Sequence, residues 1–88
     1  MDPASIPLNA NEVALLVSAA EGGDLTAQRD LSNRFFSGIG VEKDEKEAMK
    51  WLRKAAEQGD ANAQSMLSGR LLYGVGVEKD EKEGVKWL

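Results

Sequence analysis

Apolar residues recur along part of the chain at the spacing of one helix face. Ala27, Leu31 and Phe35 are four residues apart, and the same spacing returns 36 residues later. This period places the residues on a single stripe of an amphipathic helix. The pattern predicts helices over about 24–37 and 60–73.

A second set of apolar residues follows each of these segments. Trp51, Leu52 and Ala55 fall on one face of a helix. We therefore expect a second helix over about 44–58, with a shorter copy over about 80–88. Each pair of helices forms one unit.

The residues between the helical patterns are suited to begin and end helices. Asp24 and Asp60 are candidate N-caps, and Asp44 with Glu47 three residues later has the spacing of a capping box. Gly38 follows the first helix, where a left-handed residue commonly ends a helix. The chain is thus predicted to turn at a short loop containing glycine.

The turn and its surroundings occur twice. The ten residues GIGVEKDEKE begin at Gly38, and GVGVEKDEKE begins 36 residues later. Aligned at this offset, Gly23–Leu52 and Gly59–Leu88 agree at 19 of 30 positions. Self-similarity at such a period indicates a repeat array.

The repeat divides the chain into four segments. Residues 23–58 form the first repeat, and residues 59–88 form a second that is incomplete at its C-terminal end. Residues 10–22 are expected to be the second helix of a partial preceding repeat. Residues 1–9, which contain two prolines, are expected to be an extended lead-in.

Composition excludes several classes of function. The 88 residues carry a net charge of −4 and contain no cysteine and no histidine. Disulfides, thiolate zinc sites and histidine-dependent nucleophilic mechanisms are therefore excluded. An acidic chain does not favour binding to nucleic acid or to an anionic membrane.

The chain has no convincing secretory signal and no apolar run long enough to span a bilayer. We predict a soluble protein without membrane insertion. A cytoplasmic location is the default, and a delivered or secreted location stays open.

The glycine turn is a weak candidate for a ligand site. Gly38 and Gly40 lack the lysine that follows the glycines of a phosphate-binding loop. The carboxylates at residues 42–47 alternate with lysines and lack the spacing of a calcium loop. We predict a structural turn, with no metal and no cofactor.

A set of residues spread over the first repeat carries a family resemblance. The set is Ala27-Gln28-x-x-Leu31, Phe35, Gly38-x-Gly40-Val41, Asp44, Lys46, Ala48, Trp51, Ala55-Ala56 and Gly59. It resembles the Sel-one-like repeat (SLR), a relative of the tetratricopeptide repeat, and most of it recurs in the second copy. The resemblance implies an all-α, right-handed α/α solenoid, here a truncated array.

The resemblance also implies a function. Members of the family act as adaptors for other proteins, often in bacterial signalling or at the host interface. Some cysteine-rich relatives are associated with hydrolysing or binding β-lactams, but this chain has none of their cysteines. The leading hypothesis is therefore a non-catalytic module that binds a protein or peptide.

The candidate partner-binding residues lie opposite the core stripe of the first helix in each pair. Through the resemblance, this face is expected to be concave. In the first repeat the residues are Thr26, Arg29, Asn33, Phe36 and Ser37, and in the second they are Asn62, Ser65, Gly69, Leu72 and Tyr73. They differ between copies while the structural positions agree, which fits ligand recognition and fits simple surface drift equally well.

Four of these residues are the main candidates for contacts with a partner. Arg29, Phe36, Leu72 and Tyr73 are expected to be exposed; tyrosine, phenylalanine and arginine are enriched at interfaces and leucine less so. The alternative is self-association of the chain into a homo-oligomer through its open repeat ends. A β-lactam hydrolase is a third, less favoured hypothesis.

Two pairs of repeated residues are assigned to structure. Trp51 and Trp87 are predicted to lie in the core, each with an acceptor for its indole N–H. Arg34 and Arg70 are predicted to bind an internal carboxylate or carbonyl.

Overall fold

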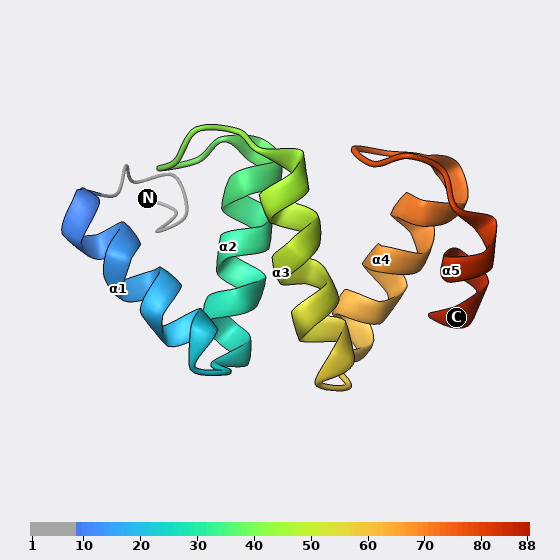
Figure 1. Cartoon of the computed structure of the whole chain (residues 1–88), viewed down its shortest axis with the longest axis horizontal. Coiled ribbons are helices and arrows are strands. Elements are labelled where there is room, and N and C mark those ends of the chain that lie inside the picture. Colours follow the sequence, from blue (N-terminus) through green and yellow to red (C-terminus); the bar gives the residue numbers. More distant parts are fainter. Residues whose placement is uncertain (1–8) are drawn as a thin grey trace.

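The computed structural model describes residues 9–88, and these residues form five helices and no strand (Figure 1). The helices are α1 (Ala10–Glu21), α2 (Leu25–Ser37), α3 (Glu45–Glu57), α4 (Ala61–Tyr73) and α5 (Glu81–Lys86). The first four agree with the expected ranges to within one or two residues. The last ends at Lys86, two residues before the predicted end. Residues 1–8 of the expected lead-in lie outside the described part of the chain.

Aspartate side chains begin the four later helices, as the sequence predicts for α2, α3 and α4. Asp24 accepts a hydrogen bond from the backbone N–H of Ala27, and Asp44 accepts from those of Lys46 and Glu47. These bonds satisfy N–H groups that have no partner inside the helix. Asn9 has the same role at the start of α1.

Glycines end α2 and α4 in the left-handed conformation. Gly38 has φ of 71° and Gly74 has φ of 68°, and in each the backbone N–H bonds to a carbonyl of the last turn. A side chain at this φ is strained, so glycine is required at both positions. The repeated glycine loop is therefore a joint between helices.

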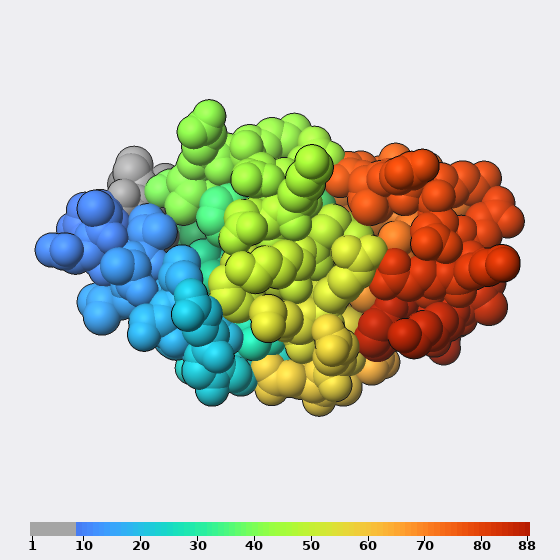
Figure 2. Space-filling model, in the orientation of Figure 1, coloured from blue at the N-terminus to red at the C-terminus, as the bar shows by residue number. Residues whose placement is uncertain are grey.

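Each helix packs against the helices immediately before and after it in the chain. The described residues form an elongated body of 38 × 22 × 22 Å, with α1 and α5 at opposite ends (Figure 1). Figure 2 shows the side formed mainly by α1, α3 and the C-terminal residues, with little of α2 visible. The helices thus alternate between two layers, as expected for a short array of helix pairs.

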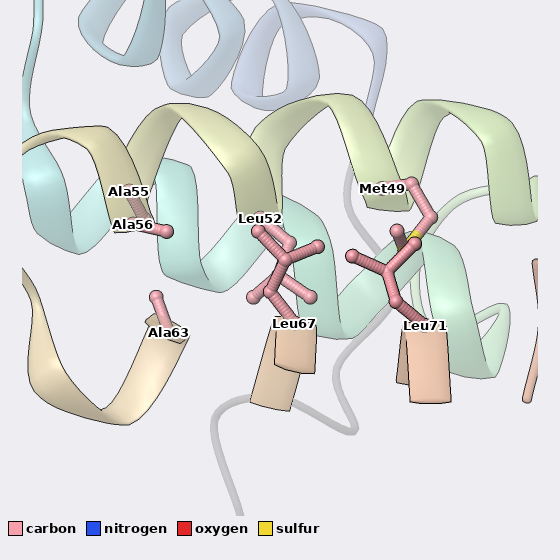
Figure 3. Packing of buried hydrophobic residues seen from close by; sticks show 7 residues of the cluster. All are labelled: Met49, Leu52, Ala55, Ala56, Ala63, Leu67 and Leu71. Carbon is pink, nitrogen blue, oxygen red and sulfur yellow. The ribbon is translucent and has the colours of Figure 1, made fainter. Parts of the chain in front are cut away.

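The larger core cluster joins the two repeats. From α3 come Met49, Leu52, Ala55 and Ala56, which meet Ala63, Leu67 and Leu71 of α4 (Figure 3). All seven side chains are at most 3% exposed. Small alanines at one end of the contact let α3 and α4 approach closely.

The smaller core cluster joins α1, α2 and α3. Ala20, Ala27, Leu31 and Trp51 form it, and Trp51 is 1% exposed. The prediction that Trp51 is a core residue is confirmed. The expected acceptor for its indole N–H is absent among the described residues, so that part of the prediction is wrong.

The last helix is held partly by an ion pair to α3. The Arg53 guanidinium donates two hydrogen bonds to Glu83, of 2.9 and 2.7 Å. The half-buried Trp87 donates its indole N–H to the same carboxylate, so here the expected acceptor is present. The hydrogen bond from Arg53 is the main reason that the pKa of Glu83 is lowered.

Candidate functional site

The predicted partner-binding residues all lie on α2 and α4. Most are exposed to solvent as expected: Thr26, Arg29, Asn33, Ser37, Asn62, Ser65 and Tyr73. Tyr73 is 80% exposed, the highest value for an aromatic residue among the described residues. The first helix of each pair therefore does offer a polar face with a few large side chains.

Two of the four emphasised residues are not exposed as predicted. Phe36 is half-buried against the larger core cluster. Leu72 is also half-buried, and an added Cβ on Gly84 would lie 2.7 Å from its Cγ. A helical wheel built on one helix misses both contacts, because they come from neighbouring helices.

A small cleft brings three of the predicted residues together. We call it the central cleft; it lies between α2 and α4, has a volume of about 50 Å³, and is lined by Arg29, Ser32, Asn33, Leu52, Asp60, Asn62, Ala63 and Met66. Arg29 also lies 3.6 Å from Asp60, the N-cap of α4. The cleft is large enough for one or two small polar groups.

A wider hollow lies at the C-terminal end of α4. We call it the α4 hollow; it has a volume of about 350 Å³ and is lined by Ser65, Met66, Gly69, Arg70, Tyr73 and Val75. Three of its side chains are large, apolar or aromatic, and exposed: Met66 at 40%, Tyr73 at 80% and Val75 at 55%. The absence of a side chain at Gly69 leaves the floor of the hollow open.

Arg70 connects this hollow to the first repeat. Its guanidinium lies 3.5 Å from the centre of the Phe36 ring, a cation–π contact, and donates a hydrogen bond to the carbonyl of Val75. Burial lowers the pKa of Arg70, opposed by the charge of Glu45. The prediction of an internal carbonyl partner is confirmed.

Arg34, the equivalent residue of the first repeat, has a different environment. It is 6% exposed, bonds to Asp30 at 2.9 Å on its own helix, and donates to the carbonyl of Ile39. Met66 replaces that aspartate in the second repeat, 36 residues after Asp30. Arg70 is therefore free to lie over Phe36 and to present one edge to the hollow.

Sequence reasoning missed Met66, Arg70 and Val75 as surface residues of the hollow. Met66 lies one turn from Asn62 and Gly69 on the same helix face, so a wider wheel sector would have included it. Val75 lies two residues after Tyr73, in the loop that follows α4, so a helical wheel of α4 does not include it. Of the predicted residues, Phe36, Ser37 and Leu72 line none of the three hollows described here.

A third hollow lies at the other end of the molecule and includes the remaining predicted residue, Thr26. We call it the N-terminal groove; it has a volume of about 430 Å³ and is lined by Glu12, Leu15, Leu16, Ala19, Asp24, Thr26, Ala27 and Asp30. Leu15 is 71% exposed. The groove runs between α1 and the start of α2.

The described residues offer little for metal chemistry. No group of three histidine, cysteine, aspartate or glutamate side chains within residues 9–88 is arranged to hold a metal ion. The helices of this part of the chain are also too short or too polar to cross a membrane.

Five helices that alternate between two layers, with a 36-residue period and glycine joints, define a helical repeat protein. The family model of the Sel1 repeat matches residues 25–60 and 61–88. The chain therefore belongs to the Sel1 repeat family, as its sequence indicates. Proteins of this family are generally protein-interaction modules and are typically not catalytic.

Solved structures agree with this assignment. A Sel1 repeat protein from Oxalobacter formigenes is 42% identical, with a TM-score of 0.75; the match covers 88% of this chain and 58% of that one. A protective antigen of uropathogenic Escherichia coli with an SLR fold is 39% identical, also with a TM-score of 0.75; that match covers 91% and 16%. The chain thus spans less than two thirds of either protein. A comparison with curated proteins found no significant match.

Proposed function

We propose that the chain is a non-catalytic module that binds a segment of another protein on the face formed by α2 and α4. The general role of the family supports an interaction module. The choice of face rests on the side chains that α2 and α4 expose.

The observation that carries the proposal is the α4 hollow. Exposed Tyr73, Met66 and Val75 surround a floor without a side chain, and Arg70 forms one edge. Exposed apolar groups placed together commonly mark interaction sites, and tyrosine and arginine are frequent binding hot spots. The hollow suits an apolar side chain of the partner.

The central cleft would supply the polar contacts. Asn33 and Asn62 each carry one acceptor and two donors, which match the N–H and C=O groups of a polypeptide backbone. Arg29 is half-exposed at the rim, although Asp60 already neutralises it in part. A partner would therefore place an apolar anchor in the hollow and its backbone along the cleft.

Selection of peptides from a displayed random library against the immobilised chain tests the proposal. Selected peptides should bind at least about tenfold more weakly to a Tyr73→Ser, Met66→Ser double variant. Both side chains are exposed, so the fold should persist; Phe36 is avoided because it packs on the core. The matched control is Val85→Ser, an equally simple loss of an exposed apolar side chain on α5. Equal binding to the double variant and the parent would refute the choice of face.

Self-association is the second candidate function. Val85 and Leu88 are 58% and 85% exposed, and they correspond to Met49 and Leu52, which α4 buries. Sedimentation over a concentration series separates the candidates. A monomer at every concentration excludes assembly, whereas a dimer weakened by Val85→Ser supports it.

A further inference from the structure

The N-terminal groove has an internal counterpart that is already filled. Five of its lining residues, moved forward by 36 positions, become lining residues of the central cleft: Leu52, Asp60, Asn62, Ala63 and Met66. In the central cleft, α2 supplies the opposite wall. The N-terminal groove is therefore the equivalent of the central cleft, but no described helix occupies the place that α2 has there.

The exposure of Leu15 shows the effect of having no helix in the place equivalent to α2. Leu15 corresponds to Trp51, which lies in a core cluster with Ala27 and Leu31 of α2 and is 1% exposed. Leu15 is 71% exposed. A helix that docked as α2 does would cover this side chain.

Glu12 indicates what kind of helix fits. It corresponds to Ala48, which is fully buried, and to Gly84, where an added Cβ would lie 2.7 Å from Leu72. The two helices of a repeat are therefore closely packed at this position. A carboxylate there disfavours an apolar repeat helix and favours a helix that brings a cation to Glu12.

The other two acidic residues of the groove, Asp24 and Asp30, also favour a cationic partner. The groove is lined by three carboxylates and by no cationic side chain. Asp30 is paired with Arg34, whereas Glu12 and Asp24 form no ion pair among the described residues. At the internal counterpart of Asp24, Asp60 lies 3.6 Å from Arg29 of α2.

We propose that the N-terminal groove binds a basic amphipathic helix of a second polypeptide. The helix places one cation against Glu12, a second against Asp24, and an apolar residue over Leu15. This surface is separate from the α4 hollow.

The internal copy specifies a probe. A peptide of residues 24–38 has the sequence of α2 and carries Arg29 in register with Asp24 of the groove. Since Leu72 meets Gly84, the equivalent Phe36 of the peptide would meet Glu12. The probe is this peptide, fluorescently labelled, with Phe36→Lys; the control peptide has Phe36→Glu.

Fluorescence anisotropy with the full 88-residue chain provides the test. The lysine peptide should bind saturably and the glutamate peptide at least about fivefold more weakly. In the protein, Glu12→Lys should reverse this preference and Leu15→Asn should weaken the lysine peptide at least about fivefold. Tyr73→Ser in the α4 hollow and Val85→Asn on α5 should change neither affinity.

Three results would overturn the proposal. One is the absence of saturable binding by the lysine peptide while circular dichroism shows a folded chain. Another is binding that Glu12→Lys and Leu15→Asn leave unchanged, which would place the peptide elsewhere. Self-association of the chain that Leu15→Asn abolishes would also count against it, because the groove would then hold a second copy.

Discussion

The centre and the two ends of this array use the same residue pattern in different surroundings. Helix α3 lies between α2 and α4 and buries six of its side chains. Helix α1 buries only Ala20, and α5 buries only Gly84. Residues 36 positions apart can thus be core in one helix and surface in another.

The difference shows that a repeat position has a meaning only together with its neighbours. Each helix pair leaves apolar side chains uncovered, and the next helix in the array buries them. The two ends differ from the centre: the Arg53–Glu83 ion pair helps to hold α5, and an acidic groove beside α1 is exposed to solvent. Three pairs of equivalent residues allow this contrast to be measured.

The largest effect is expected for Trp51 and Leu15. Trp51→Ala removes a fully buried indole and should lower the free energy of unfolding by about 3–5 kcal/mol. Leu15→Ala changes an exposed side chain and should alter it by no more than about 0.5 kcal/mol. Urea unfolding followed by circular dichroism at 222 nm measures both.

If Trp51→Ala prevents folding, Trp51→Leu provides the quantitative comparison. It gives the central position the residue found at the end of the array, and should still cost more than Leu15→Ala. Equal effects at the two positions would contradict the assignment of Leu15 to an uncovered surface.

A smaller effect is expected for Gly84, the counterpart of Ala48. By helix propensity alone, Gly84→Ala should stabilise α5 by about 1 kcal/mol. The new Cβ would, however, lie 2.7 Å from Leu72 Cγ and 3.2 Å from its backbone nitrogen. Overpacking of this kind costs about 1–3 kcal/mol, so a net loss of stability is expected.

A double-mutant cycle with Leu72→Ala isolates the clash. In the Leu72→Ala background, Gly84→Ala should be neutral or stabilising, because the crowded side chain is gone. Thermal unfolding of the four proteins gives the coupling. A stabilising Gly84→Ala in the parent would show that α4 and α5 are packed less closely than described.

The smallest effect is expected for the ion pair at Glu83. Its folded-state pKa is lowered by Arg53, so the pair stabilises the fold above the unfolded pKa of about 4.3. That contribution is lost as the pH falls through the folded pKa. Glu83→Gln should cost about 0.5–1 kcal/mol at pH 7 and almost nothing near pH 2.

Glu47 is the matched control in the central helix. The Glu47 carboxylate forms only an ion pair with exposed Lys50, in which Oε1 lies 3.6 Å from Nζ. Glu47→Gln should therefore change the free energy of unfolding by less than about 0.3 kcal/mol at pH 7. Urea titrations at pH 7, 4 and 2 compare the two variants, and an equal loss for both would refute the special role of Glu83.

Much of the fold could be predicted from the sequence. The 36-residue period recurs along the chain, and the aspartate caps and glycine ends are local signals; together they place α1 to α4 within two residues. The burial of Trp51 also follows from its position on an apolar helix face. Local hydrogen bonding and side-chain periodicity are sufficient for these predictions.

The candidate site could be predicted only in part. The sequence placed Arg29, Asn33 and Tyr73 correctly on an exposed face. It did not predict that Phe36 and Leu72 would be half-buried, since Arg70 and Gly84 cover them from other helices. It also did not bring Val75 into the α4 hollow.

The sequence by itself determined the repeat and the class of fold through its 36-residue period. It also determined the residues that begin α2, α3 and α4, because helix caps depend on neighbours within a few positions. Only the tertiary structure decided which equivalent residues are covered. Leu15 and Trp51 occupy the same repeat position, yet one is 71% and the other 1% exposed. Burial depends on the helix packed alongside, and at the N-terminal groove that helix is not part of the described chain.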